Sequence, residues 1–147
     1  MTTTPNKIKT YIYRLLAGRE YSCAKIEQKL LDKGFEPADI APILEEMRQN
    51  GTISDRRYTE IYIRSRQNKG YGPLRIRQEL QAQGLSKEMI EDQLNIADNL
   101  WFAEANRVWQ KRFRGKAPSD IKERGKHFRF LQYRGFTPEQ IKQLFDH

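Results

Sequence analysis

Apolar residues recur along the chain at the three-to-four-residue spacing of helices, and this pattern occurs three times. Three segments end alike, in KLLDKGF, ELQAQGL and FLQYRGF, and their glycines, Gly34, Gly84 and Gly135, stand 50 and 51 residues apart. Aligning these glycines brings four apolar positions into register, namely Leu30, Leu80 and Leu131; Phe35, Leu85 and Phe136; Ile40, Ile90 and Ile141; and Leu44, Leu94 and Phe145. Such agreement at a fixed period indicates an internal repeat.

Each copy of the repeat is predicted to hold three short helices. The apolar spacing of four residues before the glycine and again after it is helical rather than alternating, so no strand is predicted. Each glycine suits the left-handed residue that ends a helix, followed by an apolar residue that packs back on that helix. Upstream segments at residues 11–17, 56–68 and 102–113 show helical spacing as well. We therefore predict an all-α, elongated tandem array of three three-helix repeats, each sharing apolar surface with its neighbours.

The predicted units span residues 1–53, including a short N-terminal lead, 54–100 and 101–147. In the first two units a tyrosine, Tyr21 or Tyr71, stands five residues before an isoleucine, the spacing of a hydrophobic staple at a helix start. The third unit has Lys122 at this position instead. Asp120 with Glu123 is placed there to cap a longer helix.

Capping signals also mark the helix that follows each glycine. Thr137, Pro138 and Gln140 have the order of a capping box with proline at the first helical position. Ser86 is the corresponding cap in the second unit, and Pro37 again stands at a first helical position. These local signals predict where the third helix of each unit begins.

Charge is distributed unevenly over these units. The chain carries 27 basic and 19 acidic residues, a net charge of +8. Residues 1–55 hold eight of each sign, residues 56–100 hold eight basic and six acidic residues, and residues 101–147 hold eleven and five, so the net charge rises from zero to +2 to +6. A field of this kind favours an extended anionic partner, either nucleic acid or an acidic protein groove.

The first basic cluster flanks a Gly-Tyr-Gly-Pro turn in RSRQNKGYGPLRIRQEL, and it comprises Arg64, Arg66, Lys69, Arg75 and Arg77. The first three of these end a predicted helix, where cations complement the helix dipole, so a solvated face is one interpretation. Arg75 and Arg77 stand at the start of the next helix, where cations oppose the dipole. We therefore predict that the turn, with Tyr71, forms an anion site for a carboxylate or phosphate, aided by exposed helix N-terminal amides.

A second basic cluster lies in the third unit: Lys111, Arg112, Arg114, Lys116, Lys122, Arg124, Lys126, Arg129 and Arg134. From this cluster we select Lys111, Arg112, Lys122, Arg124, Lys126 and Arg129 as candidate contacts to a partner or to nucleic acid. The aromatic residues interleaved with them are able to stack on bases or to pack in a core. Core packing is the favoured interpretation, since Trp101 and Trp109 stand eight residues apart and share a helix face.

The residues suggest neither catalysis nor a bound cofactor. His127 and His147 are the only histidines and Cys23 is the only cysteine, which is too few ligands for a zinc site. Cys23 is interpreted as a small buried residue in a first helical turn. One cysteine suits a reducing compartment, no apolar run approaches the roughly 20 residues of a membrane span, and the start lacks a secretory signal. We expect a soluble cytoplasmic protein, monomeric, not an enzyme, and without metal or cofactor.

Residues 54–85, SDRRYTEIYIRSRQNKGYGPLRIRQELQAQGL, closely resemble the second repeat of the RecX regulatory protein family. The similarity continues in KERGKHFRFLQYRGFTPEQI and, more loosely, in LLAGREYSCAKIEQKLLDKGF. This resemblance implies a bacterial modulator of the RecA recombinase, a curved body of three-helix repeats that binds the groove of the RecA–DNA filament. It implies reduced ATP hydrolysis, strand exchange and coprotease activity in recombination and SOS repair. The first unit departs from the pattern, because CAKIEQKL lacks the arginine pair of RIRQEL, so an equal role for it is not implied.

Two other functions fit the same residues. A DNA-binding helical-repeat protein that acts without RecA would bind bare DNA strongly, with a steep dependence on salt. A helical-repeat scaffold for another acidic protein would be captured from a lysate with or without nuclease. A sequence-specific repressor is not predicted, since no single helix combines arginine with asparagine or glutamine in a base-reading pattern.

Overall fold

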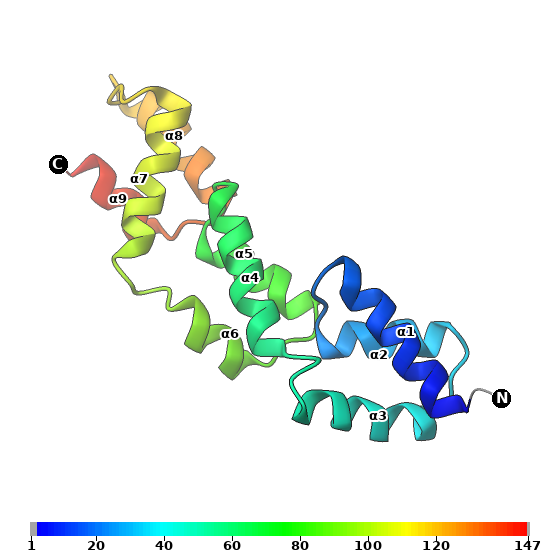
Figure 1. Ribbon diagram of the computed structural model, residues 1–147. Coiled ribbons are helices and arrows are strands. Elements are labelled where there is room, and N and C mark those ends of the chain that lie inside the picture. Colours follow the sequence, from blue (N-terminus) through cyan, green and yellow to red (C-terminus); the bar gives the residue numbers. More distant parts are fainter. Residues whose placement is uncertain (1–2, 147) are drawn as a thin grey trace.

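The protein is an elongated row of three groups of helices, with its two ends at opposite ends of the row (Figure 1). The computed structural model describes residues 3–146, in which all regular structure is helical. The first repeat holds α1 (Thr4–Gly18), α2 (Cys23–Asp32) and α3 (Pro37–Gln49); the second holds α4 (Asp55–Asn68), α5 (Pro73–Ala82) and α6 (Lys87–Leu94); the third holds α7 (Leu100–Phe113), α8 (Ile121–Arg134) and α9 (Pro138–Phe145). The prediction of an all-α array of three three-helix repeats is confirmed.

The repeat glycines end the second helix of each repeat in the predicted way. Gly34, Gly84 and Gly135 have φ values of +101°, +81° and +106°, in the left-handed region that only glycine adopts without strain. The amide after each glycine donates to the carbonyl of the leucine five residues earlier, at 3.2, 3.4 and 3.2 Å. Each of these leucines is fully buried, so the turn that closes the helix is also tied to the core.

The predicted helix starts are present as well. Thr137 and Gln140 form a capping box, with hydrogen bonds of 3.1 and 2.9 Å, and Ser86 accepts from an amide in the first turn of α6 at 3.2 Å. Asp120 caps α8 by accepting from the Glu123 amide at 2.8 Å. As expected, α8 is longer than its counterparts, with 14 residues against 10 in α2 and in α5.

The apolar interior is divided into two cores. One belongs to the first repeat: Ile8, Ile12, Ile26, Leu30, Ile40, Ile43, Leu44, Met47 and Ile53. The other runs without interruption through the second and third repeats: Tyr58, Ile63, Ile76, Leu80, Leu85, Ile90, Leu94, Trp101, Ala105, Val108, Trp109, Leu131, Phe136 and Ile141. The expectation that every unit shares apolar surface with its neighbours is therefore right for the second junction and wrong for the first.

Polar contacts hold the junction between the first and second repeats. They join Ser22 Oγ to the Gln83 carbonyl at 2.8 Å, the Cys23 amide to Asp55 Oδ1 at 2.8 Å, and Arg57 Nε to Glu20 Oε1 at 2.6 Å. Cys23 is half-buried here rather than buried as predicted, and burial, followed by the charge of Asp55, raises the pKa of its thiol. The start of α2 is thus tied to the end of α5 by side chains.

Direct backbone contacts hold the junction between the second and third repeats. The Gly72 amide donates to the Arg134 carbonyl at 2.8 Å, and the Leu74 amide donates to the Gly135 carbonyl at 2.9 Å. A Cβ atom on Gly72 would overlap the backbone of Gly135, and one on Gly135 would lie 2.5 Å from the Arg75 Cβ. The approach of α5 to the end of α8 therefore requires a glycine on both sides.

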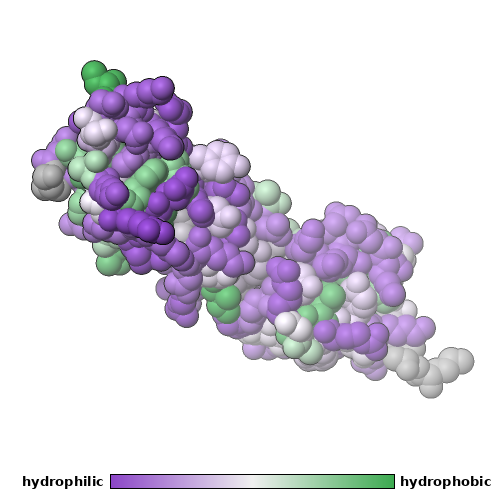
Figure 2. All heavy atoms as spheres, turned by 90° about the horizontal axis from the view of Figure 1, so that it is seen from above, coloured by the Kyte–Doolittle hydropathy of each residue, from purple (hydrophilic) through white to green (hydrophobic). Residues whose placement is uncertain are grey.

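Hydrophilic side chains cover most of the face seen in Figure 2, and apolar ones show there only as small separate patches. None of the helices within residues 3–146 combines the length and the apolar character that a membrane span needs. The fold thus presents a long and mainly polar surface, and the arrangement of charges on it becomes the main question.

Candidate functional site

Tyr71, in the turn between α4 and α5, is surrounded by three guanidinium groups. The guanidinium carbons of Arg66, Arg75 and Arg134 lie 4.0, 4.2 and 5.2 Å from the centre of its ring, within the range of cation–π attraction. These arginines come from α4, α5 and α8. The ring therefore gathers cations from the second and third repeats at one place.

Glu79 on α5 neutralises part of this arginine cluster. It accepts two hydrogen bonds from Arg66, at 2.9 and 2.7 Å, and Arg75 Nε lies 3.8 Å from the same carboxylate. Burial, followed by the charge of Glu79 and its hydrogen bond, raises the pKa of Tyr62 to about 12. The pair of Arg66 with Glu79 joins α4 to α5, whereas Arg75 and Glu79 pair within α5.

Two of the amides at the start of α5 are already engaged, whereas the predicted anion site there relied on exposed amides. The Gly72 and Leu74 amides already donate to carbonyl oxygens of α8 and its cap, at 2.8 and 2.9 Å. An anion at this end of α5 would have to displace backbone hydrogen bonds that join two repeats. These two amides are therefore not free to bind an anion in this arrangement of the repeats.

A concavity of about 270 Å³ lies beside the arginine cluster, between the end of α4 and helices α7 and α8. We call it the basic pocket, and its lining residues are Asn68, Lys69, Gly70, Arg107, Val108, Lys111, Arg112, Phe130 and Arg134. Five of these described residues are cations and none is acidic. The pocket therefore concentrates positive potential in a small, partly enclosed volume.

Two of the pocket arginines are held by the end of α4. Arg107 Nη2 donates to the Gln67 carbonyl at 2.8 Å, and Arg134 Nη1 lies 3.3 Å from the Lys69 carbonyl. Both thereby bind carbonyl oxygens at a helix C-terminus, which prefers cations. Arg107 also pairs with Glu104 at 2.9 Å, so its charge is compensated within its own helix.

Of the five pocket cations, all but Arg107 have no carboxylate within ion-pair distance among residues 3–146: Lys69, Lys111, Arg112 and Arg134. Arg112 and Arg134 lie over one aromatic ring, with guanidinium carbons 5.5 and 5.3 Å from the centre of Phe130. The pocket thus presents uncompensated charge in a preset geometry. It is able to bind a carboxylate or a phosphate, because each arginine is able to donate two hydrogen bonds to the same anion in a bidentate arrangement.

The predicted site residues divide into two sets. Six of them meet at the second junction: Arg66, Tyr71 and Arg75 in the arginine cluster, and Lys69, Lys111 and Arg112 in the basic pocket. Arg124 instead lies near Asp146, at 3.8 Å, and over the ring of Phe145. Arg64, Lys122, Lys126 and Arg129 are exposed and line neither feature.

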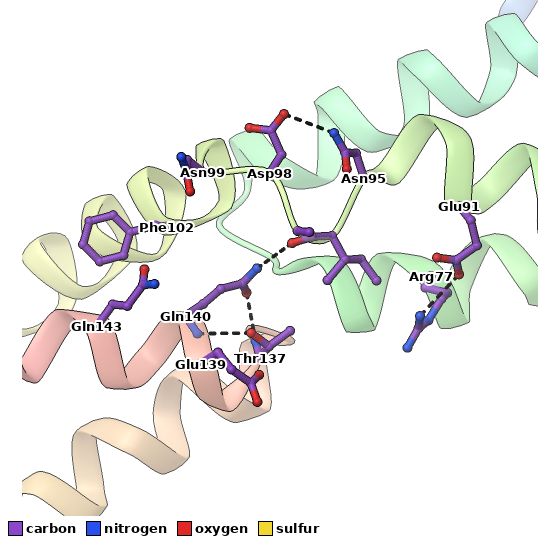
Figure 3. A pocket seen from close by; sticks show the side chains of 12 residues that line it. Arg77, Glu91, Asn95, Asp98, Asn99, Phe102, Thr137, Glu139, Gln140 and Gln143 are labelled. Carbon is purple, nitrogen blue, oxygen red and sulfur yellow. Dashed lines mark hydrogen bonds and ion pairs between the residues drawn. The ribbon is translucent and has the colours of Figure 1, made fainter.

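Arg77 belongs to a different concavity, of about 610 Å³, formed by α5, α6, the α6–α7 connection and α9 (Figure 3). Arg77 pairs there with Glu91 at 3.3 Å, and Gln140 Nε2 donates to the Ile96 carbonyl at 3.1 Å. Arg77 is the one cation lining this concavity in the described chain, beside three acids, Glu91, Asp98 and Glu139. The net charge of its lining is the reverse of that in the basic pocket, so Arg77 lies apart from the cations of that pocket.

Sequence reasoning did not single out Arg107 or Phe130 and gave no separate role to Arg134. Arg107 stands four residues before Lys111, and Phe130 stands four residues before Arg134. Residues with this spacing are neighbours on one face of a helix. The spacing of four residues between a basic residue and another basic or aromatic residue is the sequence signal that indicates both walls of the pocket.

The interleaved aromatic residues mostly pack in the core, as favoured from the sequence. Trp101 and Trp109 are 2% and 8% exposed, and Trp109 Nε1 donates to His127 Nδ1 at 3.1 Å. His127 also stacks on Phe113, with ring centres 3.7 Å apart. Burial lowers the pKa of His127, so the ring is neutral where it accepts this hydrogen bond. The other histidine, His147, lies outside the described residues.

Three family models match successive parts of the chain: "RecX, first three-helix domain" at residues 9–47, "RecX, second three-helix domain" at 54–94 and "RecX, third three-helix domain" at 99–145. The Regulatory protein RecX of Pseudomonas entomophila (strain L48) is 39% identical over 141 residues, which cover 96% of this chain and 91% of that protein. The Regulatory protein RecX of Halorhodospira halophila (strain DSM 244 / SL1) is 38% identical over 129 residues, 88% of this chain and 80% of that one.

Solved structures show the same fold. The crystal structure of RecX from Lactobacillus salivarius aligns with a TM-score of 0.85 at 21% identity, covering 97% of both chains. A second crystal structure of a regulatory protein RecX aligns with a TM-score of 0.81 at 23% identity, covering 98% of this chain and 72% of that one. The arrangement of the helices is therefore shared with proteins whose sequences differ widely from this one.

Proposed function

The chain belongs to the RecX family, and from this membership we propose that it binds the RecA–DNA filament and lowers its ATPase, strand-exchange and coprotease activities. The observation that carries this proposal beyond the family is the meeting of cations from α4, α7 and α8 around the basic pocket, with no acidic residue in the described lining. Such a surface fits the carboxylates and phosphates that a protein–DNA filament exposes.

The shared core of the second and third repeats supports a mechanism by differential binding. It holds the walls of the basic pocket in a fixed arrangement, so the pocket engages anionic groups of the filament without ordering flexible segments. A ligand shifts an equilibrium only as far as it binds one conformation better than another. We propose that the protein favours a filament conformation in which nucleotide turnover is slow.

The test is an ATPase titration of RecA filaments with the intact protein and with two charge-matched variants. The pocket variant is Lys111→Gln with Arg112→Gln, and the control is Lys7→Gln with Lys25→Gln in the first repeat, since all four side chains are exposed. We expect the wild type and the control to inhibit alike. The pocket variant should need at least about tenfold more protein, because each lost charged contact is worth about 1.5–3 kcal/mol.

The same preparations distinguish binding to the filament from binding to DNA alone. We expect tight binding to RecA-coated DNA and weak binding to bare DNA of the same length. Strong, steeply salt-dependent binding to bare DNA would favour the rival function, a DNA-binding protein that acts without RecA. A wild type that leaves the RecA ATPase unchanged would refute the proposal.

A further inference from the structure

We infer that the basic pocket binds a pyrophosphate group, carried either by free pyrophosphate or by a nucleoside diphosphate or triphosphate. Four of the five positive charges that line the pocket are not compensated by acidic side chains of residues 3–146. Lys69, Lys111, Arg112 and Arg134 surround a cavity of about 270 Å³, and none of them has an acidic partner in the described chain. Like charges held together in this way repel one another, and a compact anion with several charges removes that repulsion.

The two arginines are positioned before any ligand arrives. Arg112 and Arg134 lie over the same Phe130 ring, 5.5 and 5.3 Å from its centre, and Arg134 is also held by the Lys69 carbonyl at 3.3 Å. Their planar guanidinium groups match pairs of phosphate oxygens, and the hydrogen bond of Arg134 reduces the side-chain freedom that this residue loses on binding. Lys69 and Lys111 add point charges at the rim.

Gly70 keeps the wall of the pocket open. Its φ is +88°, and a Cβ atom there would lie 3.3 Å from Val108 Cγ2 and 3.6 Å from Arg134 Nη1. A Cβ atom at this position would press on Val108 and reach ordinary van der Waals contact with the Arg134 guanidinium. Glycine therefore leaves this wall of the pocket, between α4, α7 and α8, free of a side chain.

The shape of the charge favours pyrophosphate over other anions. A single carboxylate brings only one negative charge to four cations. Neighbouring phosphates of a nucleic acid strand are separated by a sugar, so a small cavity holds only one of these phosphates. Pyrophosphate places two phosphoryl groups, joined by one bridging oxygen, in a single cavity. It is therefore the compact ligand whose several charges best match the four cations of the pocket.

Binding has a consequence for regulation, and this consequence, unlike the binding itself, rests on the proposed function. The cations that hold pyrophosphate are the ones proposed to contact the filament. Since they cannot hold both, a soluble pyrophosphate-bearing anion would compete with the filament for the basic pocket.

The test is calorimetric titration of the full chain at constant ionic strength with sodium pyrophosphate, ADP and inorganic phosphate. We expect pyrophosphate to bind at a single site and at least about tenfold more tightly than inorganic phosphate, because it makes more charged hydrogen bonds. ADP binding as tightly as pyrophosphate would identify a nucleotide as the source of the group, and pyrophosphate binding without ADP would identify the free anion. Equal affinity for phosphate and pyrophosphate would overturn the inference.

The charge-matched variants locate the site. Lys111→Gln with Arg112→Gln should weaken pyrophosphate binding at least about tenfold, whereas Lys7→Gln with Lys25→Gln should leave it unchanged. Equal weakening in both variants would place the binding outside the pocket. On the wild type, backbone amide chemical shifts supply a measurement independent of variant folding: shifts centred on Gly70, Val108 and Phe130 support the site, and shifts centred elsewhere refute it.

Measuring the RecA ATPase in parallel separates this inference from the proposed function. Pyrophosphate binding by a protein that does not inhibit the filament would leave the inference standing and remove the proposed function. Filament inhibition by a protein that does not bind pyrophosphate would do the reverse.

Discussion

The two junctions between repeats use equivalent positions of the repeat but different chemistry. In the repeat alignment Ser22 corresponds to Gly72, and Gln83 corresponds to Arg134. At the first junction the Ser22 hydroxyl donates to the Gln83 carbonyl at 2.8 Å, and at the second the Gly72 amide itself donates to the Arg134 carbonyl at 2.8 Å. Because glycine stands at this position of the second repeat in place of serine, the backbones of the second and third repeats approach closely enough for a direct hydrogen bond.

This closer approach has consequences for the core and for the charges. The second and third repeats share one apolar core, whereas the first repeat keeps a separate one. A hydrogen bond contributes about 1 kcal/mol net, while a fully buried apolar side chain contributes about 1.5–3 kcal/mol. We infer that the second and third repeats behave as one body that holds the basic pocket rigidly, and that the first repeat opens separately.

The largest expected effect on stability concerns the two separate apolar cores. Leu131→Ala and Leu30→Ala each remove a fully buried side chain and should each cost about 3–4 kcal/mol. Leu131→Ala should lower hydrogen-exchange protection throughout α4–α9, and Leu30→Ala only in α1–α3. Loss of protection over the whole chain in both variants would show that the two cores unfold together.

The next effect tests the glycine contact of the second junction. Gly72→Ala places a Cβ atom against the backbone of Gly135 and should cost about 2–3 kcal/mol in denaturant unfolding. Gly18→Ala is the matched control, since nothing lies within 4 Å of a Cβ atom there. If the two substitutions prove equally mild, the junction is less tightly packed than we describe.

A pH-dependent effect is expected in the third repeat. Burial lowers the folded-state pKa of His127 below its ordinary value of 6.5, so the unfolded chain binds the proton more readily. The stability contributed by the neutral ring is present above pH 6.5 and is lost as the pH falls through the folded pKa. Protonation also removes the acceptor for Trp109 Nε1.

Denaturant unfolding followed between pH 7.5 and 5, with α7–α9 monitored by hydrogen exchange, measures this dependence. The groups facing His127 act in both directions: Glu123, with an oxygen 3.7 Å from Nε2, favours protonation, while Lys126 and Arg112 oppose it. His127→Gln should flatten the slope in this interval. An unchanged slope in that variant would assign the pH dependence to other groups.

The smallest expected effect on stability concerns the polar contacts of the first junction. Arg57→Gln removes the pair with Glu20, whose side chains are 40% and 26% exposed, and should cost about 0.5–1 kcal/mol at low salt. Salt should reduce the difference between wild type and variant, because partly exposed pairs are screened. Hydrogen exchange in α1–α3 measures it, and a salt-independent difference would indicate a packing role for Arg57 instead.

Much of this architecture was open to prediction because it depends on local chemistry. Helical spacing, the glycines that end helices and the caps at Ser86, Asp120 and Thr137 act over three to five residues, and all were predicted. The core positions of Trp101 and Trp109 followed from the same spacing. The candidate site was predictable only in part: charge clusters were visible, but their partners were not.

The repeat, the helices and the gradient of charge follow from the order of residues alone, because each depends on neighbours along the chain. Tertiary contacts, in contrast, determine which junction shares a core and place the carbonyl oxygens at the end of α8 against the start of α5. They also pair Glu79 with Arg66. Four cations of the pocket have no such partner in the described part of the chain: Lys69, Lys111, Arg112 and Arg134. These contacts join residues far apart in sequence, up to 65 positions for Lys69 and Arg134. They depend on how one repeat is rotated against the next, and that rotation is set by packing between helices rather than by any short-range signal.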